Sequence, residues 1–239
     1  MNYFAIEHSM NRKIVGKIPH TKEIFYNCSV DDPNLIDRYH FQEIIGVPYL
    51  ATPILHDRAK QTDIIDTYSV MGFGFGSMVI SEKFKNLLTH FKIYSLQYFK
   101  TFLIHKNEKI ENYWQTHISK IAYECLNFEK TIFVLKQYKE DGGVEIQEIM
   151  FRNLKEFLIY VQTLNYPKML FIKSFYFVEH MNYDYFSLRY TEDCHNGIVS
   201  EKLKNEIEKQ GITGIEFRPI EISSQNWRHS GEREKIYGL

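Results

Sequence analysis

Apolar residues recur at spacings of three and four positions over residues 84–91, with polar residues between them. This spacing places the apolar side chains on one face and predicts a helix over 82–91. Ser81 precedes the run and is expected to cap the helix, and Glu82 follows where a negative charge suits the helix dipole. From residue 93 the period changes to two, which predicts a strand over 93–104.

The helical spacing recurs in two further segments, residues 154–165 and 201–210. Asn153 is expected to cap the first of these helices, and Ser200 the second. Gly211 suits the left-handed backbone position that commonly follows the last turn of a helix. The pattern therefore predicts three main helices.

Alternating or short apolar runs predict strands in the rest of the chain, over residues 3–6, 110–118, 131–138, 144–151, 169–178, 183–190 and 214–222. Asp141-Gly142-Gly143 lies between two of these runs and predicts a hairpin turn. Residues 63–70 are expected to form a short helix, and the polar, aperiodic residues 223–239 a loose tail. The predicted fold class is therefore α+β, largely antiparallel, with a single domain over residues 1–222.

The first and last predicted helices belong to segments that match at a constant offset of 119 residues. Residues 80–88 and 199–207 are identical at five of nine positions, and the match continues without a gap to Tyr98 and Phe217. We interpret this as two repeated helix–strand units, 79–99 and 198–218. Anion binding at the two helix starts is the functional alternative, but a Glu in the first turn disfavours it.

Composition excludes several classes of protein. The formal net charge is −1 and no long basic run occurs, so direct binding of nucleic acid is not expected. Cys28, Cys125 and Cys194 are far apart and form no CxxC, which indicates a reducing compartment. Residues 1–7 lack the features of a secretory signal, and the apolar run 169–178 is too short to span a bilayer, so we expect a cytoplasmic protein.

Motifs that would indicate a catalytic, nucleotide-binding or metal site are weak in this sequence. Gly72-Phe73-Gly74-Phe75-Gly76 lacks the third glycine and the lysine of phosphate-binding loops and predicts a turn. Asp193-Cys194-His195 has a nucleophile and a base, but adjacent residues rarely point at one another. His105 and His117 could face each other across adjacent strands, without a third metal ligand. We therefore expect no cofactor, metal or catalytic activity. A hydrolase or transferase with scattered catalytic residues, and a structural scaffold, are the alternatives.

The second repeated unit contains a motif that is similar to one found in a known family. The motif comprises Val199-Ser200-Glu201-Lys202-Leu203-Lys204, then Ile207, then Gly211-Ile212-Thr213-Gly214-Ile215-Glu216-Phe217. Together with Lys60-Gln61-Thr62-Asp63-Ile64 and Ile80-Ser81-Glu82-Lys83-Phe84, these residues resemble immunity proteins of bacterial polymorphic and contact-dependent toxin systems. Immunity family eleven is the nearest match, with family forty-three second, and the resemblance spans roughly residues 45–220. It implies a protein that binds and neutralises a cognate toxin and has no catalytic site.

Two predicted loops combine tyrosine with carboxylates, a mixture that suits contact with a basic protein. We therefore expect the toxin to bind at a hairpin tip and at a second loop, through Tyr138, Glu140, Asp141, Tyr183, Asp184, Tyr185, Glu192 and Asp193. The toxin is expected to act in the cytoplasm and to be blocked by steric occlusion.

Overall fold

A computed structural model describes residues 2–67, 77–191 and 197–238 of the chain and confirms the α+β class. The strands are β1 (Tyr3–His8), β2 (Thr21–Tyr26), β3 (Ala51–Leu55), β4 (Ile64–Ile65), β5 (Val79–Ser81), β6 (Leu96–His105), β7 (Glu108–Ile118), β8 (Ile132–Tyr138), β9 (Val144–Ile149), β10 (Lys168–Ser174), β11 (Tyr185–Phe186), β12 (Ile198–Ser200) and β13 (Ile215–Pro219). The helices are α1 (Arg12–Val15), α2 (Glu82–Leu88), α3 (Leu154–Gln162), α4 (Glu201–Lys209), α5 (Ser224–His229) and α6 (Glu232–Tyr237), with short 3-10 turns at Ile36–Arg38 and Tyr123–Cys125.

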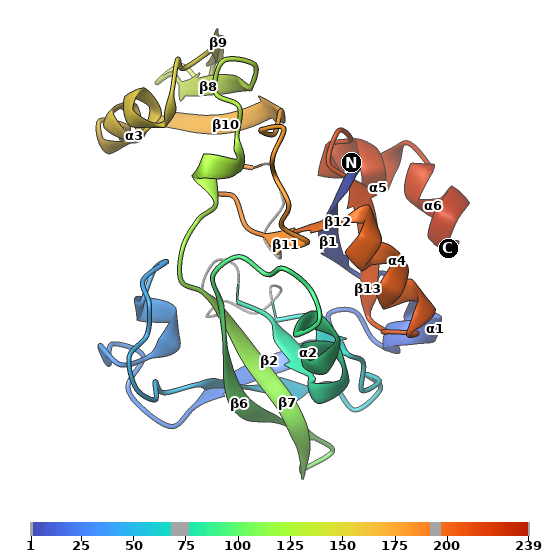
Figure 1. Cartoon of the computed structure of the whole chain (residues 1–239). Coiled ribbons are helices and arrows are strands. Elements are labelled where there is room, and N and C mark those ends of the chain that lie inside the picture. The colour runs from blue at the N-terminus through green and yellow to red at the C-terminus, as the bar shows by residue number, and fades with distance from the viewer. Residues whose placement is uncertain (1, 68–76, 192–196, 239) are drawn as a thin grey trace.

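The strands form three sheets, ordered β2-β3-β6-β7-β5-β4, β11-β12-β1-β13 and β10-β8-β9. Within the sheets, β3 and β6 pair in parallel and the other neighbours are antiparallel. Figure 1 shows the six-stranded sheet in the lower part of the molecule, the four-stranded sheet beside it, and the three-stranded sheet above with α3. The three longest helices in the described residues, α2, α3 and α4, lie in the three predicted helical segments.

Two of the sheets contain the same four-strand arrangement. In the order β4-β5-β7-β6, Ile64 pairs with Ile80, and in β11-β12-β1-β13 the corresponding residues Tyr185 and Val199 pair. Phe99 of β6 and its counterpart 119 residues later, Arg218 of β13, also occupy matching positions opposite β7 and β1. The shared strand order therefore extends the match from the helices to the sheets. The offset stays at 119 residues for β5 and β6, whereas Ile64 and Tyr185 differ by 121. β1, from the start of the chain, takes the place that β7 has in the other sheet.

The helix starts have side-chain caps. Ser81, Asn153 and Ser200 have extended backbones, and the side chain of each accepts a hydrogen bond from the backbone N–H three residues on. Gly211, just past α4, has a φ of +60°, in the left-handed region that glycine adopts without a Cβ clash. Local sequence thus determines where α2, α3 and α4 begin and where α4 ends.

The buried apolar residues form two main clusters. One lies between α2, α4 and the two matching sheets and includes Phe84, Leu88, Leu203 and Ile207. The other, centred on Phe157 of α3, lies beneath the three-stranded sheet and is largely aromatic. Burial of each such side chain contributes roughly 1.5–3 kcal/mol, so α3 anchors one sheet while α2 and α4 hold the other two together.

Several local predictions differ from the structure. Ile64–Ile65, expected in a short helix, form β4 because they pair with β5. The strand expected over 183–190 reduces to Tyr185–Phe186. Residues 223–239 are not a loose tail in their described part. They form α5 and α6, which bury Trp227 and the guanidinium of Arg233.

The docking of α5 and α6 depends on ion pairs that local patterning does not reveal. Arg233 donates to both carboxylate oxygens of Glu216, over 2.6 and 2.7 Å, and both residues are buried. Arg228 of α5 donates to Glu7 of β1 over 3.4 Å. Each helix has only six residues, too few to display a clear apolar period. None of the described helices is long and apolar enough to span a membrane.

Candidate partner-binding surface

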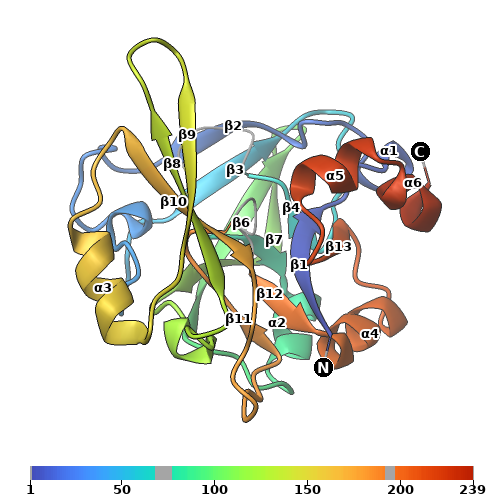
Figure 2. The same cartoon turned by 90° about the horizontal axis from the view of Figure 1, so that it is seen from above.

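The β8–β9 hairpin projects beyond the rest of the molecule (Figure 2). At its tip Gly142 has a φ of +83°, and the Asp141 side chain accepts a hydrogen bond from the Gly143 N–H over 2.8 Å. The side chains of Tyr138, Glu140 and Asp141 are exposed. The structure therefore leaves this predicted contact site accessible, at the end of a projecting two-stranded arm.

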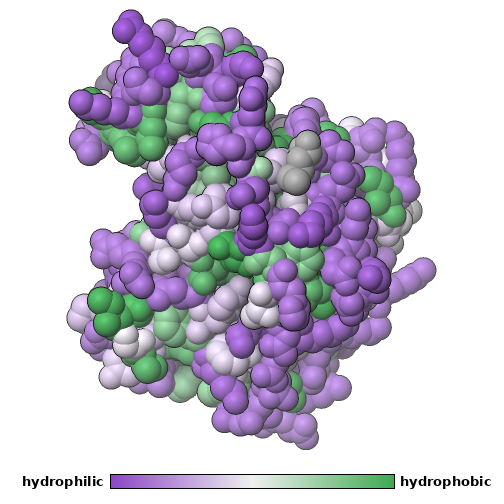
Figure 3. All heavy atoms as spheres, in the orientation of Figure 1, coloured by the Kyte–Doolittle hydropathy of each residue, from purple (hydrophilic) through white to green (hydrophobic). Residues whose placement is uncertain are grey.

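The outer face of the three-stranded sheet continues from this tip. Alternation places one set of side chains toward the aromatic core and the other set outward. The outward set includes four exposed apolar residues, Tyr138, Val144, Ile146 and Met169. Tyr138 pairs with Val144, and Ile146 and Met169 lie on either side of Lys136. Figure 3 shows apolar residues among hydrophilic ones on the lobe that carries this sheet and α3. Apolar side chains within a polar surround are typical of protein-binding surfaces.

Acidic residues gather at the hairpin tip and along β9, whereas the outer face of the sheet also carries Lys136 and Lys173. Residues 140–149 contain four carboxylates and no cationic side chain. Lys139 lies 3.3 Å from Glu145, and Lys173 of β10 donates to Glu148. These pairs are solvent-exposed and contribute roughly 0–1 kcal/mol each to stability, so their loss on partner binding costs little.

The second predicted contact site is incorrect for Asp184 and Tyr185, because both are buried. Tyr185 is fully enclosed in the core between the matching sheets. Tyr183 is half-buried, and its ring makes an edge contact with Tyr94 at 5.0 Å between centroids. Glu192 and Asp193 lie outside the described residues. The Tyr-Asp-Tyr segment thus serves the fold rather than an exposed surface.

Asp184 organises the junction between the two matching units. Its carboxylate accepts hydrogen bonds from the Ser200 hydroxyl over 2.8 Å and from the Lys92 backbone N–H over 3.1 Å. Ser200 caps α4, whereas Lys92 belongs to the turn after α2. One buried carboxylate therefore joins the start of one helix to the end of the other.

Asp63 makes the corresponding contacts in the other direction. It accepts from the Ser81 hydroxyl over 2.6 Å and from the Thr213 backbone N–H over 2.8 Å. Ser81 caps α2, and Thr213 follows α4. Sequence reasoning did not identify Asp63 as a structural residue. The available signal was an Asp before two apolar residues, placed 16 to 18 residues ahead of each Ser-Glu-Lys motif.

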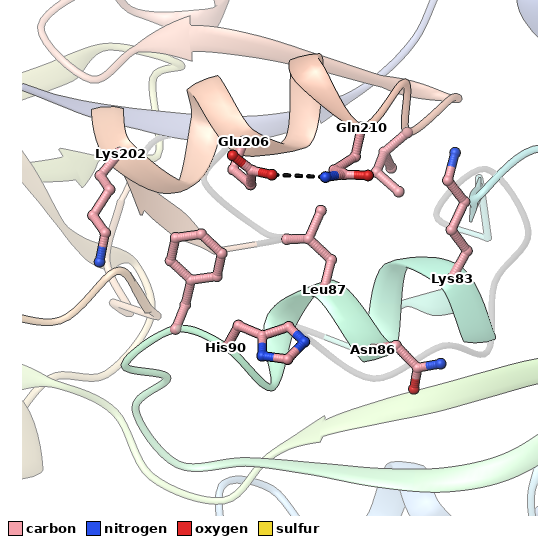
Figure 4. Close-up of a pocket in the computed structure, with 9 residues that line it drawn as sticks. Lys83, Asn86, Leu87, His90, Lys202, Glu206 and Gln210 are labelled. Carbon is pink, nitrogen blue, oxygen red and sulfur yellow. Dashed lines mark hydrogen bonds between the residues drawn. The ribbon is translucent and has the colours of Figure 1, made fainter.

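A groove of about 420 Å³ lies between α2 and α4 (Figure 4). Leu87, Phe91 and Ile212 supply its apolar lining, and Lys83 and Lys202 stand at opposite ends. Lys83 donates to the Gly211 carbonyl over 3.0 Å, and Lys202 lies 3.7 Å from Asp184. Both ammonium groups are therefore engaged within the protein, which weakens the case for an anion site.

The described residues do not form a recognisable catalytic centre. Burial raises the pKa of the Cys125 thiol to about 12, the opposite of what an activated nucleophile needs. His105 and His117 do not face each other, because they lie at opposite ends of the β6–β7 pair. Each ring instead contacts a backbone carbonyl, of Asp57 and Gln42 respectively. Cys194 and His195 are outside the described residues, and no group of three metal-ligating side chains occurs within them.

Comparison with known families shows which family the chain matches. The model described as the Immunity protein family (Imm11) matches residues 2–222 and so covers nearly the whole chain, including both helix–strand units and the three-stranded sheet. No curated protein matches the chain.

Proposed function

The chain belongs to the Imm11 immunity protein family, and we propose that it binds a cognate toxin acting in the cytoplasm and blocks it sterically, without catalysis. The family match over residues 2–222 is the observation that carries this proposal. Neutralisation of a toxin is the function that the family implies in general. The place of action, the mechanism and the contact surface are the parts that we add.

The hairpin surface supports binding at the three-stranded sheet. It combines an exposed aromatic residue, exposed aliphatic residues and carboxylates on one projecting arm. Aromatic side chains in apolar surroundings are frequent hot spots, and carboxylates around them favour a basic partner. Many toxins that act on nucleic acid or nucleotides need a basic surface to hold phosphate groups, so an acidic arm is suited to cover such a surface.

Steric occlusion is consistent with the projecting position of this arm. The hairpin is held by β10 on one side and by the aromatic core around α3 beneath it. A segment whose backbone is already paired in a sheet loses less conformational entropy on binding than an unpaired loop, which favours tight complexes. A standard interface of about 1,600 Å² in total would suffice. The free thiols Cys28 and Cys125 suit a reducing compartment, in line with cytoplasmic action.

The direct test is to co-express the protein with the toxin domain encoded next to its gene. We expect growth to be rescued and the two proteins to co-purify, whereas an unrelated toxin should still kill the cells. Failure of both rescue and co-purification with the neighbouring toxin would show that this proposal is wrong.

A titration in vitro separates steric from catalytic neutralisation. If the protein occludes its partner, the toxin's activity should fall linearly and reach zero at one equivalent. If a small fraction of an equivalent abolishes the activity with time, the protein acts as an enzyme on the toxin or its product. Linear inhibition therefore supports the binding proposal, and substoichiometric inactivation contradicts it.

A further inference from the structure

The outer edge of β9 is open. β9 is the last strand in the order β10-β8-β9, and no described segment pairs with its far side. Five of its six residues are exposed, and the sixth is half-buried. Unpaired edges of this length template the addition of a further strand, unless charges or bulges prevent it. The β8–β9 register runs without a shift over six pairs, so no bulge twists this edge away.

The hydrogen-bond pattern identifies the backbone groups that face outward. Lys139 N–H donates to the Gly143 carbonyl over 2.8 Å, which makes this pair a hydrogen-bonded one. Hydrogen-bonded and non-hydrogen-bonded pairs alternate along an antiparallel ladder. Residues 145, 147 and 149 therefore bond to β8, while Val144, Ile146 and Glu148 direct their N–H and C=O groups away from it.

The side chains of these same three residues lie on the outer face of the sheet. Ile146 is 63% exposed, and Val144 is also exposed beside Tyr138 of the neighbouring strand. An added strand would thus find backbone partners and an apolar strip at the same place. These two features are what proteins use to bind an extended peptide at an open sheet edge. In that mode main-chain hydrogen bonds give affinity and alternate side chains give specificity.

Charge distinguishes between two occupants of the edge. A second copy of this chain, paired β9 to β9, would bring together two segments that each have four carboxylates and no cation between residues 140 and 149. Like charges opposite each other in a sheet are destabilising. A segment with lysine or arginine on both of its faces would instead complement Glu145 on one face of the sheet and Glu148 on the other.

We propose that the toxin supplies an extended, basic segment that adds to the outer edge of β9 as a fourth strand of the β10-β8-β9 sheet. The inference rests on the proposed function and specifies how the complex forms. The backbone groups of Val144, Ile146 and Glu148 bond to this segment. Its apolar side chains pack on Ile146 and Val144, and its basic side chains lie beside the carboxylates of the hairpin.

Residue-resolved amide exchange on the wild-type protein, with and without the neighbouring toxin domain, tests this pairing. In the free protein the amides of residues 144, 146 and 148 should exchange rapidly, and those of 145 and 147 slowly. On binding, the first three should slow at least tenfold. A complex that leaves these three amides unchanged overturns strand addition but not the immunity function. The absence of any complex overturns both.

A proline variant provides a second measurement. Ile146→Pro removes the outward N–H, a site where an edge strand tolerates proline, and Ile146→Ala removes the side chain alone. Strand addition predicts that Ile146→Pro binds the toxin at least tenfold more weakly than Ile146→Ala, while amides 145 and 147 stay protected. Equal affinities with the hairpin intact would overturn it. Slowed exchange at residue 146 without toxin, together with a dimer in solution, would assign the edge to a second copy and overturn it too.

Discussion

The two helix–strand units and the β8–β9 hairpin use carboxylates in opposite ways. Asp63 and Asp184 turn inward, and each joins the cap of one helix to the turn after the other. The carboxylates between residues 140 and 149 are all exposed. A carboxylate that accepts several backbone and hydroxyl donors specifies a fold, whereas one in solvent contributes little to stability and is available to a partner.

The comparison also separates two kinds of apolar residue. The apolar residues of α2 and α4 are buried between the two sheets that share one strand order, so they stabilise the fold without any partner. Those on the outer face of the three-stranded sheet gain their burial only from a partner. We therefore expect substitutions in the first region to change stability and substitutions in the second to change affinity.

The largest effect on stability is expected from truncation of Phe157, the side chain at the centre of the aromatic core beneath the three-stranded sheet. Phe157 is fully buried, with ring contacts to Phe133 and Phe151 at 5.2 and 5.4 Å. Phe157→Ala should lower the free energy of unfolding by about 3–5 kcal/mol in chemical denaturation. Ile159→Ala, on the exposed side of the same helix, should change it by less than about 0.5 kcal/mol. Equal effects would contradict the assignment of α3 as the anchor.

Next in size is the loss of the buried junction. Asp184→Ala removes the acceptor for the Lys92 N–H and the Ser200 hydroxyl, so unfolding should become easier by about 3 kcal/mol. Asp63→Ala should cost less, about 1–2 kcal/mol, because Asp63 is partly solvated. Glu145→Ala in the hairpin should be nearly neutral. Urea unfolding of the three variants measures the order, and a neutral Asp184→Ala would contradict the role of the junction.

A smaller, pH-dependent effect should also be confined to the body of the molecule. Burial lowers the pKa of His8, His20 and His117, whereas β8, β9 and β10 contain no histidine. Below the unfolded value of about 6.5 the unfolded chain binds more protons than the folded one, so stability should fall as the pH drops from 7.5 to 5.5.

Denaturation midpoints across this pH range provide the measurement. In His20→Gln the dependence on pH should be weaker, because one of the three titrating groups is gone. A wild-type midpoint that is flat or rises on acidification would be inconsistent with buried neutral histidines.

The smallest effect concerns the rate of association. Replacing Glu145 and Glu148 with Gln should leave stability within about 0.5 kcal/mol of the wild type. At low salt the on-rate for a basic toxin should fall several-fold, and the difference should shrink as salt screens the charges. An unchanged on-rate at low salt would show that Glu145 and Glu148 do not contribute to association with the toxin.

The sequence predicted the features that depend on local patterns. The three main helices, their serine and asparagine caps and the Asp-Gly-Gly hairpin all follow from residues within a few positions of one another. It did not predict that β1 takes the place of β7, because that pairing joins the two ends of the chain. Residues 223–239 were misjudged for the same reason, since distant Glu216 and Glu7 hold them in place.

The candidate site was predicted only in part. The hairpin tip was identifiable because a tight turn of Asp and Gly between two strands projects into solvent. Asp184 and Tyr185 combine a carboxylate with a tyrosine, as the hairpin tip does, and this composition suits a contact loop. In the fold both are buried, and Asp184 bonds to Lys92 and Ser200. The open edge of β9 could not be predicted, because strand order within a sheet is a property of the whole fold.

We propose that the toxin binds the projecting three-stranded sheet rather than the body of the molecule. Ile146 of β9 and Ile236 of α6 offer a matched pair, with exposed fractions of 63% and 62%. The decisive measurement is the affinity of Ile146→Lys and Ile236→Lys for the toxin domain encoded beside the gene, with both variants shown to be folded. We expect Ile146→Lys to bind at least tenfold more weakly than the wild type and Ile236→Lys to bind with unchanged affinity. Wild-type affinity in Ile146→Lys, or a loss confined to Ile236→Lys, would contradict it.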